Sequence, residues 1–141
     1  MGKTLPQAVI SQEAADILIV GATAKATEMG LNMAIAVVDC SGALKAFRRM
    51  DGAPLLSTDI ATNKAYTAAA YGLATHVWHD FIKEDPPLLH GIVHTPRLVV
   101  FGGGYPVEID GSIVGAIGIS GGHYAQDMQV AEAALEALSA S

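Results

Sequence analysis

The chain has 141 residues, of which 51% are hydrophobic and 16% are charged, and its formal net charge is -6 at pH 7. This length suits a single domain, residues 1–141, with a hydrophobic core of its own. Only 8 residues are lysine or arginine. This is too few for the dense positive face that a nucleic acid requires, so we expect no nucleic-acid partner.

The low charged fraction leaves more apolar surface than one chain readily buries. An ordinary soluble protein has about 25% charged residues, and assembly is the simplest way to cover the excess apolar surface. We therefore expect a homo-oligomer.

The sequence shows no signal for secretion or membrane insertion. Cys40 is the single cysteine, which excludes a disulfide within the chain. The first ten residues contain no sustained apolar stretch of the kind found in signal peptides. The uncharged run between Asp110 and Asp127 contains five glycines and is too short to span a bilayer. We expect a cytoplasmic protein with no membrane partner.

The first half of the chain predicts one helix and two strands. Ser11 is a good N-cap residue for a first helix that runs to about Met29. The apolar, β-branched run at 33–38 and the segment 43–49 have the composition of strands. Because the turn between them is tight, we expect them to pair antiparallel.

The second half predicts three helices, one loop and three strands. Ser57 is expected to cap the first of these helices, which runs to about Tyr71. Asp110-Gly111 is a two-residue hairpin signal between the last two strands. The remaining expected segments, in chain order, are a helix at 75–83 ended by Asp85-Pro-Pro87, a loop at 84–96, strands at 98–101, 106–109 and 112–119, and a helix at 123–138.

The resulting order of elements is α-β-β-α-α-β-β-β-α. Tight turns between strands favour an antiparallel sheet over a parallel stack of βαβ units. The sequence therefore predicts an α+β fold, in which helices pack on a five-stranded antiparallel sheet.

The run Gly102-Gly103-Gly104 is the sharpest local feature. Glycine N–H groups without neighbouring side chains can wrap an anionic group. However, neither the lysine of a Walker A loop nor a helix directly follows the run. The run predicts either a tight bend between strands or a ligand-binding loop.

Three ionisable side chains are candidate catalytic groups. Asp127 lies on the apolar stripe of the last predicted helix, with His123 one turn earlier. A carboxylate that faces a core needs a partner, either His123 in an acid–base pair or the free N–H groups of the preceding glycine-rich turn. Lys64 is flanked by small residues, so it either points into a pocket as an anion ligand or base, or extends to solvent.

Two further groups are candidates for binding ligands. Arg49 and Asp51 flank a methionine at a strand end, where they predict either a short-range ion pair or an anchor for an acidic ligand. Four histidines in two pairs offer ligands to a metal, unless they are ordinary surface or core histidines. These histidines are His76, His79, His90 and His94.

Several stretches of the chain form a joint pattern. They are Ala36-Val-Val-Asp39 with Gly42, Arg49-Met-Asp-Gly-Ala53, Ala61 with Lys64-Ala65 and Thr67-Ala68, Thr75, Gly102-Gly-Gly-Tyr-Pro106, Asp110-Gly111, and Gly115-Ala-Ile-Gly-Ile-Ser-Gly-Gly122 with Gln126-Asp127. Together these stretches, from about residue 18 to 138, resemble the GlcG/HbpS-like family. That family also supplies the C-terminal domain of PduO-type corrinoid adenosyltransferases.

The resemblance implies an α+β sheet domain, assembly into dimers or octamers and, for some members, haem binding or haem degradation. It also marks positions of the shared pattern. We take Arg49, Asp51, Thr75, Gly103 and Gly104 among these as candidate cofactor-binding residues, and Lys64 and Asp127 stay candidate catalytic residues.

We therefore expect a small-molecule-binding protein with haem or another tetrapyrrole as the candidate cofactor. Any of the five histidines can serve as an axial ligand of haem. Two alternatives stay open. One is an isomerase or lyase without a cofactor, which acts on a small acidic or carbonyl metabolite through Lys64, His123 and Asp127. The other is a non-catalytic oligomeric sensor.

Overall fold

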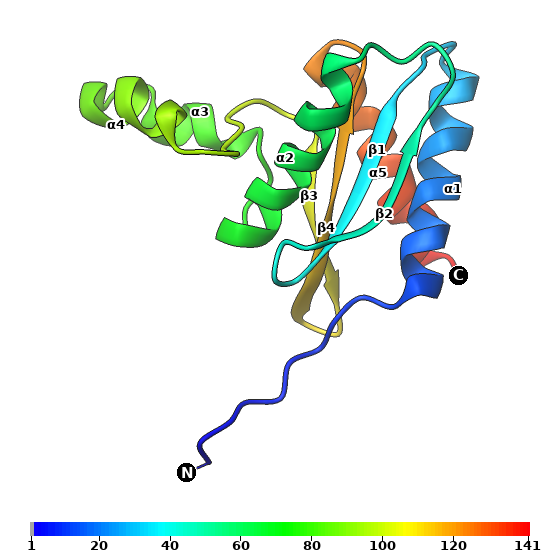
Figure 1. Ribbon diagram of the computed structural model, residues 1–141, viewed down its shortest axis with the longest axis horizontal. Coiled ribbons are helices and arrows are strands. Elements are labelled where there is room, and N and C mark those ends of the chain that lie inside the picture. The colour runs from blue at the N-terminus through cyan, green and yellow to red at the C-terminus, as the bar shows by residue number, and fades with distance from the viewer. Residues whose placement is uncertain (1) are drawn as a thin grey trace.

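The computed structural model describes residues 2–141, which form a four-stranded antiparallel sheet with helices on both faces (Figure 1). The strands are β1 (Ala34–Asp39), β2 (Leu44–Arg49), β3 (Gly104–Ile109) and β4 (Ser112–Ser120). Their order in the sheet is β2-β1-β4-β3, so the two central strands come from opposite halves of the chain. The sheet therefore forms only when both halves fold together.

Three long helices cover the sheet. They are α1 (Gln12–Glu28), α2 (Leu56–Tyr71) and α5 (Tyr124–Ser139). α1 and α5 lie side by side on one face, and α2 lies alone on the other (Figure 1). Among residues 2–141, no helix is long and apolar enough to cross a membrane.

A projecting segment follows α2. It consists of two short helices, α3 (Val77–Ile82) and α4 (Pro86–Gly91), and the 3-10 turn Ile92–His94. In Figure 1 this segment extends sideways from the sheet, and residues 2–9 extend from the opposite end of the molecule. The compact body thus carries two extensions, and within the projecting segment the side chains of Trp78 and Ile82 are buried.

The main core lies between the sheet and the pair formed by α1 and α5. In β1, Ile35 and Val37 belong to this core, whereas Ala34, Ala36 and Val38 belong to a second core beneath α2. All five side chains are fully buried. Because both faces of β1 are covered, its sequence is a continuous apolar run rather than an alternating one.

The face beneath α2 is packed very closely because its residues are small. Gly118 of β4 faces α2, and a Cβ added to it would overlap the carbonyl oxygen of Ala61 and lie 2.6 Å from the nitrogen of Ala65. The backbone of α2 therefore rests directly on the sheet. This close approach fixes the position of the side chains that α2 presents, including Lys64.

The predicted α+β class and antiparallel pairing are confirmed, but the sheet has four strands rather than five, and residues 2–141 contain five helices. The predicted strand at 98–101 does not join the sheet. Instead, Val99 N donates to Thr67 Oγ1 at 3.0 Å, and that hydroxyl donates to the Arg97 carbonyl at 2.9 Å. The segment is fastened to α2, and a short apolar run by itself does not distinguish this arrangement from a strand.

The predicted loop at 84–96 is also wrong, since it contains α4 and the 3-10 turn. Asp85 caps α4 by accepting a hydrogen bond from Leu88 N at 3.4 Å, and prolines occupy the first helical positions. Proline is favoured there because its missing N–H is not needed in the first turn. Asp85-Pro-Pro87 thus starts one helix as well as ending another.

Two local predictions about turns and caps are confirmed. Ser11 Oγ accepts a hydrogen bond from Ala14 N at 3.1 Å and caps α1. Asp110 and Gly111 have φ values of 52° and 81°, as a tight two-residue hairpin requires.

We expect Gly118→Ala to lower the free energy of unfolding by about 1–3 kcal/mol, the usual cost of overpacking a tight core. The added methyl group would meet the backbone of α2, which cannot move aside as a flexible side chain would. Gly91→Ala on α4 is a matched control, because a Cβ there meets nothing within 4 Å. We expect this control to be neutral or slightly stabilising. Urea denaturation measures both variants, and equal stabilities would contradict the close packing of α2.

Candidate functional site

A buried ion pair connects the two helical layers. Lys64 of α2 and Asp127 of α5 are both buried, and Lys64 Nζ donates to Asp127 Oδ2 at 2.8 Å. Lys64 Nζ also donates to the carbonyl oxygen of Ile119 at 2.8 Å, and Asp127 Oδ1 accepts from Gly122 N at 3.1 Å. Both charged groups are therefore supplied with hydrogen bonds although they are shielded from water.

The glycine run lies directly over this ion pair. Gly103 has a φ of +125°, and a Cβ at this position would lie 2.6 Å from Lys64 Nζ and 2.8 Å from the Ile119 carbonyl oxygen. Any side chain here would displace the ammonium group. Glycine is thus required at position 103 for two reasons: there is no room for a side chain above the ion pair, and the backbone has a positive φ.

The glycine loop is held rigidly at both of its sides. Gly104 N donates to Thr75 Oγ1 at 2.9 Å, and Thr75 N donates to the Gly104 carbonyl at 2.9 Å. On the other side, Ile119 N donates to the Gly103 carbonyl at 2.9 Å. The predicted site residues Thr75, Gly103 and Gly104 are therefore brought together with Lys64 and Asp127.

Burial opposes the charge on both members of the pair. Removal from water lowers the pKa of Lys64 and raises the pKa of Asp127, whereas the contact between the two groups shifts each pKa in the opposite direction. A buried pair of this kind adds little stability compared with two apolar side chains, but it is costly to leave one member alone. The pair therefore fixes the geometry of the loop more than it adds to the total stability.

An open cavity of about 390 Å³ lies on the outer side of the glycine loop. It is lined by His76, His79, Asp80, Val100, Phe101, Gly102 and Tyr124. Lys64 Nζ lies 5.1 Å from the centroid of the Phe101 ring. Lys64 is not among the residues that line this cavity, so the buried ammonium supports the wall without facing the space inside.

The four predicted metal-ligating histidines do not gather at one point. His76 and His79 line the cavity, whereas His90 lies on α4 and His94 in the 3-10 turn. Within residues 2–141, no three side chains of His, Cys, Asp or Glu are placed to hold a metal ion. The structure therefore offers two histidines to a ligand in the cavity, and no site for a bare metal ion is built from the four.

The predicted acid–base pair between His123 and Asp127 does not form. His123 is the N-cap of α5, and its Nδ1 accepts from Ala125 N at 3.1 Å, while Gln126 Oε1 accepts from His123 N at 3.0 Å. Asp127 is occupied by Lys64 and Gly122. The other partner that the sequence offered for Asp127, an N–H group of the glycine-rich turn, is the one observed.

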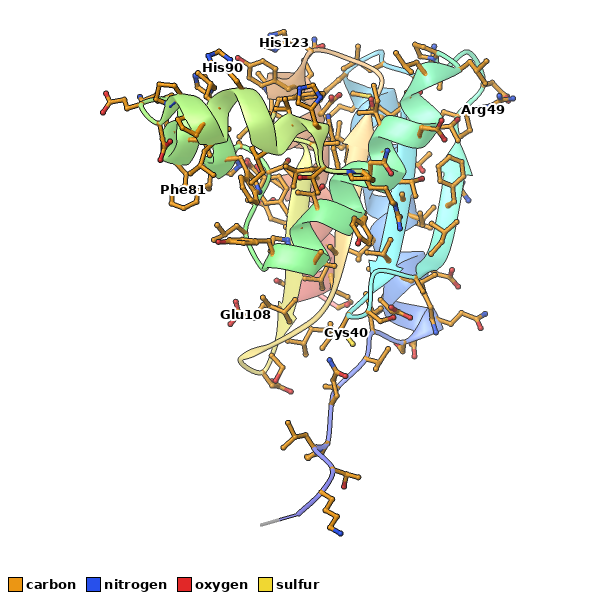
Figure 2. All side chains as sticks on the ribbon, turned by 60° about the vertical axis from the view of Figure 1, so that its left-hand side comes forward. Cys40, Arg49, Phe81, His90, Glu108 and His123 are labelled. Carbon is orange, nitrogen blue, oxygen red and sulfur yellow. The ribbon has the colours of Figure 1, made fainter. Side chains whose placement is uncertain are left out.

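Arg49 and Asp51 lie apart from the histidine cavity. Figure 2 shows Arg49 on the opposite side of the molecule from Phe81 and His90, which belong to the projecting segment. Arg49 and Asp51 line a different cleft near the end of β2. The predicted set of cofactor-binding residues is thus divided between two regions.

Phe101 and Tyr124 line the cavity but were not among the predicted site residues. Phe101 was not considered as a site residue because 98–101 was predicted as a strand. The sequence did contain a signal for both aromatic residues. Phe101 directly precedes the glycine run, and Tyr124 directly follows His123. Both are partly exposed large apolar side chains, which indicates a surface that binds something.

The fold and the site define a class of small α+β domains that keep an open cavity, lined by histidines and aromatic residues, against a rigid glycine loop. The chain belongs to the HbpS-like family, because a family model described as "Haem degrading protein HbpS-like" matches residues 10–136. The predicted resemblance to this family is therefore confirmed.

Individual relatives agree with this assignment. The chain is 39% identical, over 99% of both chains, to a Citrobacter freundii protein described as an uncharacterized 15.0 kDa protein in the dhaT-dhaS intergenic region. It is similar to the crystal structure of Klebsiella pneumoniae protein ORFY, with a TM-score of 0.92 and 33% identity over 100% of this chain and 98% of that one. A crystal structure described as a PduOC:heme complex has a TM-score of 0.85 and 34% identity, over 92% of this chain and 94% of that one.

We expect Lys64→Met and Asp127→Leu, each made alone, to lower the free energy of unfolding by about 3–5 kcal/mol, because each leaves a buried charge without its partner. The double variant replaces the pair by apolar side chains and should recover most of that loss. Urea denaturation of the single and double variants measures the coupling energy between Lys64 and Asp127. This energy is the difference between the loss in the double variant and the sum of the two single losses.

Lys83→Met is the control for the ion pair. It removes an exposed pair, Lys83 with Asp80 at 3.2 Å, and should cost at most about 1 kcal/mol. Single variants at the buried pair that cost no more than this control would contradict its role in fixing the two helical layers.

Proposed function

We propose that this protein binds haem, or a closely related tetrapyrrole, in the cavity outside the glycine loop. The main support is that two histidines and two aromatic side chains line one open cavity. Further support comes from the 34% identical relative that was solved as a haem complex. Imidazole is a common axial ligand of haem iron, and apolar walls favour the flat faces of the macrocycle.

The residues of the cavity fit such a group. Val100, Phe101 and Tyr124 supply apolar contacts, and the volume of about 390 Å³ lies within the range of about 300–1,000 Å³ typical of small-molecule sites. Because the cavity is open to solvent, the charged substituents of a bound tetrapyrrole would not have to be buried. This arrangement avoids the cost of burying those charges.

His79 is the residue that we assign as the iron ligand. It lies on α3, is exposed, and its imidazole makes no hydrogen bond with the rest of residues 2–141. The His76 ring instead packs against Tyr105, with 5.5 Å between the ring centroids. We therefore assign His76 to the wall of the cavity. Bound haem iron would supply the oxygen and redox chemistry that haem degradation requires, while these residues hold and orient the group.

The alternative of acid–base catalysis without a cofactor has less support. Lys64 and Asp127 are buried, and neither lines the cavity. His123 is exposed, but its Nδ1 already caps α5. A base that cannot reach a substrate proton does not catalyse its removal, so we assign Lys64 and Asp127 to the support of the glycine loop.

We expect haemin to give a saturable Soret band with the purified chain. His79→Ala should weaken haem binding by about tenfold or more, since even the loss of a residue behind a metal ligand produces changes on this scale. His90→Ala on α4 is the matched control, because His90 is also exposed but does not line the cavity. Absorbance titration with haemin measures the haem affinity of the wild type and of both variants.

Two results would count against this proposal. A wild-type chain that shows no saturable change on titration with haemin would rule out haem binding. An unchanged spectrum and affinity in His79→Ala would remove His79 as the ligand and leave the cavity assignment to be tested with Phe101→Ala.

We also propose that the chain forms a homo-oligomer through the projecting segment. Val77, Phe81, Leu88 and Val93 are exposed apolar side chains on this segment. Exposed apolar residues that cluster on one extension are typical of a contact surface between proteins.

Light scattering after size-exclusion chromatography tests this assembly. We expect Phe81→Glu to lower the measured mass and Val20→Glu on α1 to leave it unchanged, since the two side chains are similarly exposed (57% and 61%) but lie on different surfaces. A wild-type chain that elutes as a monomer would contradict the assembly.

A further inference from the structure

A second polar cleft lies at the end of β2, away from the histidine cavity. Its volume is about 460 Å³, and it is lined by Thr23, Asn32, Arg48, Arg49, Met50 and Asp51. Figure 2 shows Arg49 at the side of the molecule opposite His90 of the projecting segment. This cleft is therefore separate from the proposed haem site.

Arg48 and Arg49 both line this cleft, and neither makes an ion pair within residues 2–141. The ion pairs among residues 2–141 join Lys25 to Glu28, Lys64 to Asp127 and Lys83 to Asp80. The N–H donors of Arg48 and Arg49 are therefore not taken up by acidic side chains of the described residues.

Arg48 is held in place by a neutral group. Its Nη1 donates to Thr23 Oγ1 at 3.1 Å, and the Thr23 hydroxyl donates its own proton to the Ile19 carbonyl at 2.7 Å. Arginine has five N–H donors in a planar fork. One is used for this anchor, so the orientation of the guanidinium is fixed while other donors stay available to a ligand.

The floor of the cleft is fixed by the backbone. Met50 N donates to the Met33 carbonyl at 2.9 Å, which ties the end of β2 to the start of β1. Gly52 has a φ of +83°, and a Cβ there would lie 3.0 Å from Asn32 Nδ2. Glycine at position 52 thus leaves room for the side-chain amide of Asn32. This amide makes no hydrogen bond within residues 2–141.

We propose that this cleft binds a small oxyanion, with a carboxylate or phosphate group held by Arg48 and Arg49 and assisted by Asn32. Arginine forks match both groups geometrically, because each offers two acceptor oxygens in one plane. Asp51 lines the same cleft and adds an acceptor. The preferred ligand therefore carries a hydrogen-bond donor beside its charged group, as a hydroxycarboxylate or a hydrogen phosphate does.

Titration with inorganic phosphate and, separately, with lactate at constant ionic strength tests this proposal. We expect saturable shifts of the backbone amide signals of Asn32 and Gly52 in NMR spectra with at least one of the two probes. The probe that binds more tightly identifies the source of the oxyanion. Arg48→Gln and Arg49→Gln should each weaken this binding by about tenfold, the scale of a lost hydrogen bond between charged groups.

Lys45→Gln is the matched control for charge. Lys45 is also an exposed cation of β2 that makes no ion pair within the described residues, but it does not line the cleft. Its variant should bind the probes like the wild type. The absence of saturable shifts with both probes, or arginine variants that bind as Lys45→Gln does, would overturn the proposal. The haem titration of Arg49→Gln should match the wild type, which separates this result from the test of the haem cavity.

Discussion

The whole arrangement depends on one buried contact, the ion pair between Lys64 and Asp127. α2 and α5 lie on opposite faces of the sheet (Figure 1), and this pair joins them at the end of β4, beside the carbonyl of Ile119. Charged groups shielded from water tolerate little change in geometry, because each lost hydrogen bond is costly there. The pair therefore constrains where the two helical layers meet, although two apolar side chains would give a similar stability.

The glycines and the cavity follow from this constraint. Gly118 lets α2 approach the sheet closely enough for Lys64 to reach Asp127, and Gly103 leaves space for the ammonium group. The loop that covers the pair also forms one wall of the cavity through Phe101 and Gly102. The opposite wall belongs to the projecting segment, which is anchored by the buried ring of Trp78, 4.9 Å from that of Tyr71. The glycine loop thus faces a segment that Trp78 attaches to α2.

Much of the fold follows from local sequence signals, and the errors have a common cause. The Ser11 cap and the Asp110-Gly111 hairpin are confirmed because each depends on contacts within a few residues. The segment 98–101 was wrongly predicted as a strand, since Val99 N donates to Thr67 of α2, 32 residues away, rather than to a strand. For the site, the sequence marked the glycine run, Lys64 and Asp127 individually, and it offered His123 or the glycine-rich turn as the partner of Asp127. It did not indicate that Lys64 contacts Asp127.

The sequence by itself determined the α+β class, the antiparallel pairing and the family, since periodicity, turn residues and shared motifs are properties of short stretches. Only the tertiary structure decided that Lys64 meets Asp127, that His76 and His79 share a cavity with Phe101 and Tyr124, and that Arg49 lies elsewhere. The physical reason is the order of the sheet. β1 and β4 are neighbours although they are far apart in the chain, so the side chains that meet around them are selected by packing across the sheet and not by distance along the sequence.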